Sequence, residues 1–188
     1  MFKEYLNILN QISSLSEHSQ KQLLMYVTTK RIKKGDFLLK HGDVCKHIYF
    51  VKKGLLRIFY YKNGKEITEW FANEKHFCFS ITSYFENSPS NLIIEALEDS
   101  VIICLSKNGQ ETLRKTNIEI ANLLVTTLSR SLMLSQKRME SIQFETAQQR
   151  YQNLLKQQPT ILQKVPLQYV ASFLGITQET LSRIRAKV

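Results

Sequence analysis

The chain has 188 residues, 43% of them hydrophobic, with 26 Lys and Arg against 16 Asp and Glu, a formal net charge of +10. This length suffices for one ordinary domain and a smaller second one. The charge favours a polyanionic partner, nucleic acid or an anionic membrane surface, although it also serves solubility. Residues 1–20 are too polar for a signal peptide, and no stretch approaches the roughly 20 apolar residues of a transmembrane helix. We therefore expect a cytoplasmic protein that does not enter membranes.

The residues that usually carry metal or catalytic chemistry are scattered. Cys45, Cys78 and Cys104 are odd in number, widely separated and without a C-x-x-C pair, which argues against a disulfide framework or a structural zinc site and favours buried thiols. The four histidines lack metal-ligand spacing, and the sequence has no Gly-rich phosphate loop and no nucleophile motif. We expect no enzymatic activity, no metal and no cofactor.

The first elements in chain order are a helical stretch and then a β-rich region. Within residues 1 to about 27, Ser16 can cap a helix whose packing residues are Leu15, Leu23, Leu24 and Val27. From Thr28 to about Ser106 the chain has short segments rich in β-branched and aromatic residues, at 47–54, 55–62, 65–71, 91–97 and 101–106. Asn63-Gly64 between two of them is the strongest hairpin signal. This spacing predicts an antiparallel barrel or jelly roll.

Within the β region, residues 76–97 contain no Gly, Lys or Arg. Aromatic side chains stand there at Phe77, Phe79, Tyr84 and Phe85. They either fill the core of the roll or line a pocket for an apolar or neutral effector. The sequence leaves both possibilities open.

A long helix follows, because no Gly or Pro occurs between Gly109 and Pro159. Residues at alternating steps of four and three form an a/d seam over three heptads: Ala121, Val125, Leu128, Leu132, Ser135, Met139 and Ile142. The seam either packs on its own roll or pairs with a second copy. We favour the homodimer, because Ile120, Leu124 and Leu134 lie off the seam and could cover the roll. A further helix is predicted from about Ala147 to Gln157.

The chain closes with two short amphipathic helices in residues 165–188. Pro166 opens the first, whose apolar face is Leu167, Val170, Ala171 and Leu174. Gly175 supplies a tight turn, Ile176 closes the packing between the helices, and Thr177 can cap the second helix. Leu181, Ile184 and Val188 form the buried stripe of that second helix. This spacing is typical of a DNA-binding helix-turn-helix, although it also occurs in helical hairpins that bind nothing.

Opposite the buried stripe, the second helix presents polar side chains suited to base edges: Gln178, Glu179, Ser182 and Arg183. Gln can pair with adenine, Arg with guanine, and Glu can accept from cytosine. From Lys137 onward there are eight Lys or Arg and three Glu, so this tail holds half of the net charge. We expect phosphate contacts from Thr177, Lys164, Arg185 and Lys187.

The order of these parts resembles the Crp/Fnr family of bacterial transcription regulators over essentially the whole chain. The most specific segments are the roll entry at 34–43, the turn at Gly54, and L-G-I-T-Q-E-T-L-S-R at 174–183. The resemblance implies base-reading roles for Gln178, Glu179 and Arg183. It also implies double-stranded DNA with a pseudo-palindromic operator and RNA polymerase as partners.

The chain departs from the family pattern in three ways. Relatives that bind cyclic AMP hold its ribose with a Gly-Glu pair and its phosphate with an Arg, and residues 76–97 offer no such cation, so we expect no usual cyclic AMP response. The clustered cysteines that hold an iron–sulfur cluster in some relatives are missing. The sequence ends at Val188 without the β-hairpin wing of many relatives, so we expect weak or strongly salt-dependent DNA binding.

We therefore expect an α+β protein with an N-terminal helix, an antiparallel β-roll, a long dimerisation helix and a small helical domain. The predicted parts are a cyclic-nucleotide-binding-like sensor at 1–116, the dimerisation helix at 117–143, and the helix-turn-helix at 144–188. The predicted function is sequence-specific DNA binding by a homodimeric transcription regulator. The alternative is a ligand-sensing or scaffold roll with a vestigial DNA-binding segment. The effector, the operator and the choice between activation and repression are not encoded in any recognisable motif.

Overall fold

In the computed structural model, which describes residues 2–186, two helices open the chain. They are α1 (Lys3–Ile12) and α2 (Glu17–Leu24). As predicted, Ser16 caps a helix: its hydroxyl accepts a hydrogen bond from the backbone N–H of Ser19 at 3.3 Å. The single helical stretch expected up to about residue 27 is divided by this cap, and Val27 instead begins a strand.

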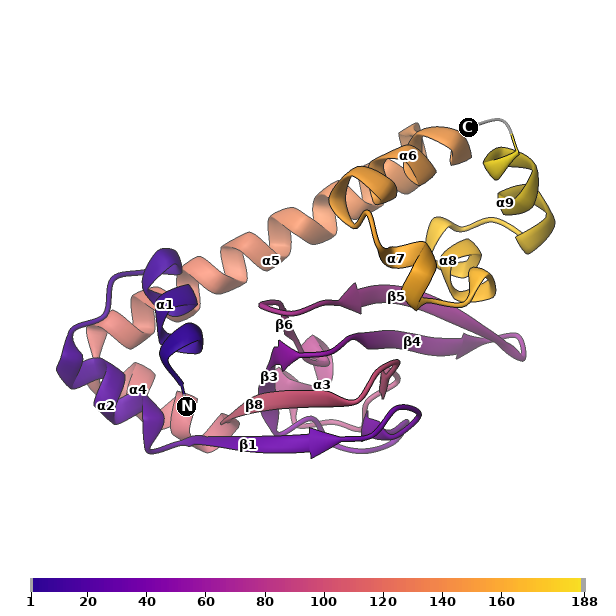
Figure 1. Ribbon diagram of the computed structural model, residues 1–188. Coiled ribbons are helices and arrows are strands. Elements are labelled where there is room, and N and C mark those ends of the chain that lie inside the picture. Colours follow the sequence, from indigo (N-terminus) through magenta and orange to yellow (C-terminus); the bar gives the residue numbers. More distant parts are fainter. Residues whose placement is uncertain (1, 187–188) are drawn as a thin grey trace.

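The predicted antiparallel roll is confirmed as two four-stranded sheets (Figure 1). The first has the order β1-β8-β3-β6, formed by β1 (Val27–Ile32), β8 (Ser100–Ser106), β3 (His47–Lys53) and β6 (Phe77–Cys78). The second has the order β2-β7-β4-β5, formed by β2 (Phe37–Leu39), β7 (Ile93–Ala96), β4 (Leu56–Lys62) and β5 (Lys65–Ala72). All strand pairs are antiparallel.

The predicted Asn-Gly hairpin joins β4 to β5. Lys62 pairs with Lys65, so the loop has two residues, and both Asn63 (φ 51°) and Gly64 (φ 73°) have left-handed backbone. Such a turn matches the twist of the flanking strands and favours the Asn-Gly sequence. β5 is the edge strand of its sheet, and the C-terminal helices contact this edge.

Alternating side chains of the first sheet separate two cores. Tyr49 and its cross-strand partner Cys104 face the space between the sheets, whereas Phe50 and its partner Ile103 face the helices α1 and α2. The three cysteines are buried without a disulfide, as expected, in the core between the sheets. Burial raises the pKa of the Cys104 thiol to about 11, so this thiol stays protonated near neutral pH.

The interval between Gly109 and Pro159 is helical as predicted, beginning with α4 (Lys107–Thr116) and α5 (Ile118–Phe144). The Asn117 side chain caps α5 by accepting from the backbone N–H groups of Glu119 and Ile120. Ile120 and Leu123 are buried in the core under α1 and α2. The remainder of α5 extends past the roll toward the C-terminal helices (Figure 1).

The C-terminal segment forms α6 (Ala147–Gln157), with the bounds predicted, followed by α7 (Ile161–Lys164), α8 (Leu167–Leu174) and α9 (Gln178–Arg185). These helices do not form a core of their own. Leu55, Phe71 and Leu97 of the roll belong to the same buried cluster as Tyr151, Val170 and Leu181, members of the C-terminal helices. The expected helical domain is therefore packed directly on the roll.

Among residues 2–186, no helix combines the length and the apolar character needed to cross a membrane.

Candidate nucleic-acid interface

The sequence from Leu167 to Arg185 folds as two helices joined at Gly175. The backbone of Gly175 is left-handed (φ 68°), and its N–H donates to the carbonyl of Ser172, which ends α8. Thr177 caps α9 by accepting from the N–H of Thr180 at 3.2 Å. Ala171 and Leu181 are buried between the helices. The local features of a helix-turn-helix predicted from the sequence are all present, except that Val188 lies outside the described residues.

The four candidate base-reading residues lie together on the outer face of α9. Gln178, Glu179, Ser182 and Arg183 are exposed and line one shallow, open hollow. Hydrogen bonding from Thr177 and from its own backbone N–H lowers the pKa of Glu179, and Arg183 acts in the same direction, so Glu179 is ionised at neutral pH. The face offers an amide, a carboxylate, a hydroxyl and a guanidinium, which are the donors and acceptors needed at base edges.

The candidate phosphate contacts are more dispersed. We call the surface formed by Gln178, Glu179, Ser182 and Arg183 the reading face. Arg185 is exposed at the end of α9, and the exposed Thr177 uses its hydroxyl to cap the helix. Lys164 lies on α7 and forms an ion pair with Glu98 of the roll at 3.3 Å. Lys187 lies outside the described residues. The phosphate roles remain predictions, and Lys164 would have to exchange one anionic partner for another.

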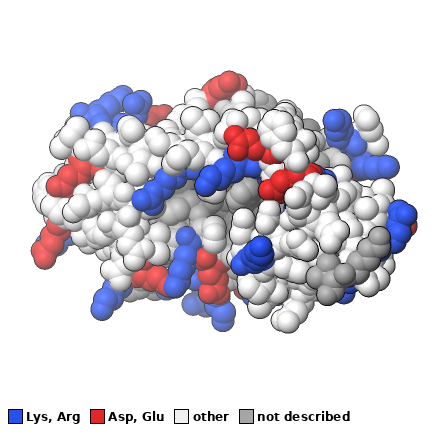
Figure 2. All heavy atoms as spheres, turned by 90° about the horizontal axis from the view of Figure 1, so that it is seen from above, with Lys and Arg blue, Asp and Glu red and all other residues white. Residues whose placement is uncertain are grey.

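The candidate dimer seam is largely uncovered in the single chain. Val125 is 62% exposed and Leu132 is 71% exposed, and Met139 and Ile142 are each about half exposed. Ala121 and Leu128 are half-buried, whereas Ser135 is exposed. Figure 2, which views the molecule from above, shows charges of both signs scattered among large uncharged areas. An exposed apolar stripe of this kind on a 27-residue helix is typical of a surface that binds a partner.

The three residues of α5 outside the seam that were expected to cover the roll differ in their exposure to water. Ile120 is buried and Leu124 is half-buried, as expected. Leu134 is 51% exposed, so the expectation that it covers the roll is wrong. Ile120 packs in the core under α1 and α2 near the start of α5, whereas Leu134 lies further along that helix and belongs to none of the buried clusters.

The aromatic residues proposed as an effector pocket do not form one group. Phe79, Tyr84 and Phe85 contact one another, with ring centroids 5.2 to 6.3 Å apart. Phe77 instead packs on Phe50 at 5.0 Å, in the core under α1. Tyr84 is fully buried and Phe85 is about half exposed. The structure therefore separates Phe77 from the candidate pocket.

The segment around Tyr84 carries a helix that the sequence analysis did not predict, α3 (Ile81–Glu86). Buried serine hydroxyls around it are satisfied internally: Ser90 donates to Ser80 at 2.9 Å, and Ser83 donates to the carbonyl of Ser88 at 2.5 Å. The Tyr84 hydroxyl donates to Gln110 of α4 at 3.3 Å, and Lys107 donates to the Tyr84 carbonyl. Lys107 and Gln110 carried no sequence signal, because both reach this segment from a different element.

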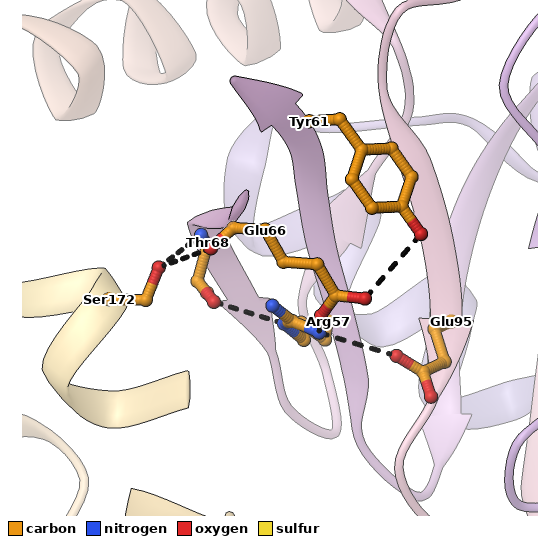
Figure 3. Close-up of polar contacts among 6 residues, drawn as sticks. All are labelled: Arg57, Tyr61, Glu66, Thr68, Glu95 and Ser172. Atoms are coloured by element: carbon orange, nitrogen blue, oxygen red, sulfur yellow. Dashed lines mark hydrogen bonds and ion pairs between the residues drawn. The ribbon is translucent and has the colours of Figure 1, made fainter. Parts of the chain in front are cut away.

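A second feature that the sequence did not predict is the contact between α8 and the β4–β5 hairpin (Figure 3). The Ser172 hydroxyl accepts from the N–H of Thr68 at 2.8 Å and donates to the carbonyl of Glu66 at 3.1 Å. The ring centroid of Tyr169 lies 3.5 Å from the guanidinium carbon of Arg57. We call these four residues, Arg57, Thr68, Tyr169 and Ser172, the docking contact.

The long helix also holds α8. Arg138 of α5 donates to the carbonyl of Phe173 and lies 3.9 Å from the centroid of its ring. Phe173 in turn packs on Trp70 and Phe71 of β5. Burial, together with nearby Arg150, lowers the pKa of Arg138 to about 10, so it remains charged at neutral pH. One helix of the helix-turn-helix is thus fixed to both the roll and α5.

Comparison with known proteins agrees with this architecture. Residues 29–117 match the family model of the Cyclic nucleotide-binding domain. The chain is 24% identical over 122 residues to the cAMP-dependent protein kinase regulatory subunit of Candida albicans, an alignment covering 64% of this chain and 25% of that protein. The chain thus spans about a quarter of the length of the curated relatives it matches.

Two solved structures show the same fold over nearly the whole chain. FixK2 from Bradyrhizobium japonicum superposes with a TM-score of 0.73 and 18% identity, covering 86% of this chain and 83% of that one. The Catabolite Activator Protein of Thermus thermophilus superposes with a TM-score of 0.60 and 22% identity, covering 96% and 85%. The chain also shares its fold with a putative transcriptional regulator of the crp/fnr family from Eubacterium rectale, with a TM-score of 0.73 and 20% identity, covering 97% of this chain and 86% of that one. At the level of fold, the resemblance predicted from the sequence is confirmed.

Proposed function

We propose that the protein is a homodimeric, sequence-specific DNA-binding transcription regulator of the Crp/Fnr type. The observation that carries this proposal is the exposed polar face of α9, where Gln178, Glu179, Ser182 and Arg183 lie side by side. The face stands on a helix whose other side is anchored by the fully buried Leu181. The neighbouring folds support a regulator rather than an enzyme.

Dimer formation through α5 is supported by the exposed seam. Pairing of two long helices would cover Val125, Leu132 and Met139, which are otherwise exposed to water. A two-fold axis along the seam relates the two α9 helices, and they would enter successive major grooves about one helical turn apart. The operator would therefore be pseudo-palindromic. We also expect the cytoplasm as its location and RNA polymerase as a partner.

Absence of the usual cyclic AMP response is supported by the chemistry of residues 76–97. This segment offers no cation for a cyclic phosphate. The Tyr84 ring fills the adjacent core, and the nearby Lys107 is engaged by the Tyr84 carbonyl and by Glu111 at 3.8 Å. A phosphate would have to displace these contacts.

Selection of duplexes from a random pool tests the proposal. The full chain should enrich a pseudo-palindromic site with half-sites separated by about 10 base pairs, one helical turn. The double variant Glu179→Ala/Arg183→Ala should enrich no site, because it removes half of the reading face without touching the buried stripe. Exposed Gln163→Ala on α7 is the control. Absence of enrichment by the parent chain would favour the alternative, a ligand-sensing or scaffold roll with a vestigial DNA-binding segment.

A further inference from the structure

The docking contact closes an open edge of the roll. β5 is the last strand in the order β2-β7-β4-β5, so one row of its backbone groups lacks a neighbouring strand. Unpaired edge groups are costly when they are shielded from water. Ser172 satisfies an N–H and a carbonyl of this edge at once, through Thr68 and Glu66 (Figure 3). A single side chain of α8 thus takes the place of a strand.

Next to this edge, α8 covers a buried cation. Arg57 is 1% exposed and is held by Thr68 at 3.0 Å, Glu66 at 2.7 Å and Glu95 at 3.7 Å. Its guanidinium carbon lies 4.2 Å from the centroid of the Phe59 ring and 3.5 Å from the centroid of the Tyr169 ring. The Nη2 atom is buried and has no hydrogen-bond partner in the described structure, so its contacts with the two rings are the polar guanidinium's remaining favourable interactions there. Departure of α8 would remove one of these rings and expose the ion cluster.

The reading face remains free while α8 is docked. The polar contacts to the roll come from α7 and α8, through the Lys164–Glu98 ion pair and the docking contact, and α9 contributes its buried side chain Leu181 to the shared apolar core. Gln178, Glu179, Ser182 and Arg183 remain exposed on the other side of the helix pair. Docking therefore does not hide the surface that would meet DNA.

A contact with α5 also fixes the position of α8 relative to the proposed dimer axis. Arg138 joins α8 to α5 through Phe173, and α5 is the helix that carries the seam. The roll, the seam and α8 are thus held in one fixed relation by contacts between residues of the chain itself.

We propose that Arg57, Thr68, Tyr169 and Ser172 are positioning residues that fix α9 for DNA reading, and that the docked form reads DNA with no small-molecule effector. This inference rests on the proposed function. The inference adds to the proposed function that a contact within each chain determines the orientation of its α9 helix.

The first experiment separates effector dependence from DNA binding itself. The full chain, refolded from denaturant and dialysed to remove small molecules, is used for duplex selection with and without a small-molecule cell extract. We expect the same enriched site under both conditions. Enrichment that requires the extract would overturn the inference while leaving the proposed function intact. Failure to enrich under either condition would instead refute the proposed function.

The second experiment tests the positioning role through half-site spacing. One base pair added between half-sites rotates them by about 35 degrees, so rigidly held readers should prefer the parent spacing about tenfold. Ser172→Ala and Tyr169→Ala should reduce this preference to less than about threefold. Ser14→Ala, in the exposed loop between α1 and α2, is the matched control.

The measured quantity is the ratio of affinities for the two spacings, which does not depend on the fraction of folded protein. A variant that is merely destabilised loses affinity for both duplexes equally. An unchanged ratio in Ser172→Ala and Tyr169→Ala would therefore overturn the positioning role, whatever the loss of absolute affinity.

Discussion

The sequence pattern and the structure both place Arg183 on the exposed polar face of α9. It is exposed on α9, and its guanidinium has a 3.5 Å contact with the Thr180 hydroxyl, a neutral partner that it can leave at little cost. Guanidinium groups pair bidentately with guanine. The position was predicted from helical periodicity alone, because which residues share a face of a short helix is a local property.

Replacing Arg183 by Ala should weaken binding to the selected operator by about 1 to 3 kcal/mol and relax the preference at one base position. Titrations against the operator and its single-base variants measure both effects. Arg185→Ala is the comparison. Arg185 lies on α9 beside the reading face and is a predicted phosphate contact, so its loss should weaken binding to all of the duplexes alike. Parent-like affinity and base preference in Arg183→Ala would show that the reading face is assigned wrongly.

Arg57 illustrates what residue-level reading of the sequence missed. Its partners are Glu66, Thr68, Glu95 and Tyr169, which lie on three other elements. No periodicity in β4 distinguishes it from the exposed cations of the chain. Its role arises because β5, β7 and α8 all meet at Arg57 of β4.

Arg57→Ala should lower the free energy of unfolding by about 3 to 5 kcal/mol, because it leaves the carboxylates of Glu66 and Glu95 next to a cavity without their cation. Urea denaturation measures this loss. Arg31→Ala on β1 is the matched control, and because Arg31 is exposed, it should change stability by less than about 0.5 kcal/mol. Equal effects of the two substitutions would contradict the structural role assigned to Arg57.

At the scale of elements, the exposed apolar residues of α5 allow a direct test of the proposed dimer. Leu132 of the seam and Met133 beside it are 71% and 56% exposed in the single chain, so neither is needed to fold it. A dimer formed along the seam would bury Leu132 and leave Met133 outside the interface.

Leu132→Glu should raise the dimer dissociation constant at least about a hundredfold, because burying an unpaired carboxylate costs several kcal/mol. Met133→Glu adds the same charge next to the seam and should leave the dimer largely intact. Sedimentation velocity over a concentration series measures both constants. If Met133→Glu dissociates the dimer and Leu132→Glu does not, the seam has been placed on the wrong face of α5.

The long helices and the β4–β5 hairpin were predictable element by element, whereas the short elements β2, β6 and α3 were not. α5, α6 and the β4–β5 hairpin carry strong periodicity or a specific turn pair. β2 and β6 have three and two residues, and α3 has six. Elements this short are formed by the sheets and hydroxyl networks around them rather than by their own sequence.

At the scale of the whole molecule, the filled roll predicts no response to cyclic AMP. A ligand at 100 times its dissociation constant stabilises a protein by about 2.7 kcal/mol, which for a chain of this size raises Tm by about 5 to 10 °C. We expect about 1 mM cyclic AMP to change Tm by less than about 1 °C. A cyclic-nucleotide-binding protein with an intact phosphate-binding arginine serves as the positive control in the same melt. A rise of several degrees in this chain would mean that the Tyr84 segment opens to admit the nucleotide.

The sequence by itself determined the features that depend on neighbouring residues: the roll with its hairpin, the long helix with its apolar stripe, and the helix pair with the polar outer face of α9. Periodicity, capping and turn chemistry act over a few residues, so they can be recognised in the chain alone. The tertiary structure decided where these parts meet. The partners of the docking contact are separated by about a hundred residues, from Thr68 to Ser172. Such a contact requires complementary surfaces on already folded elements, and no local pattern records them.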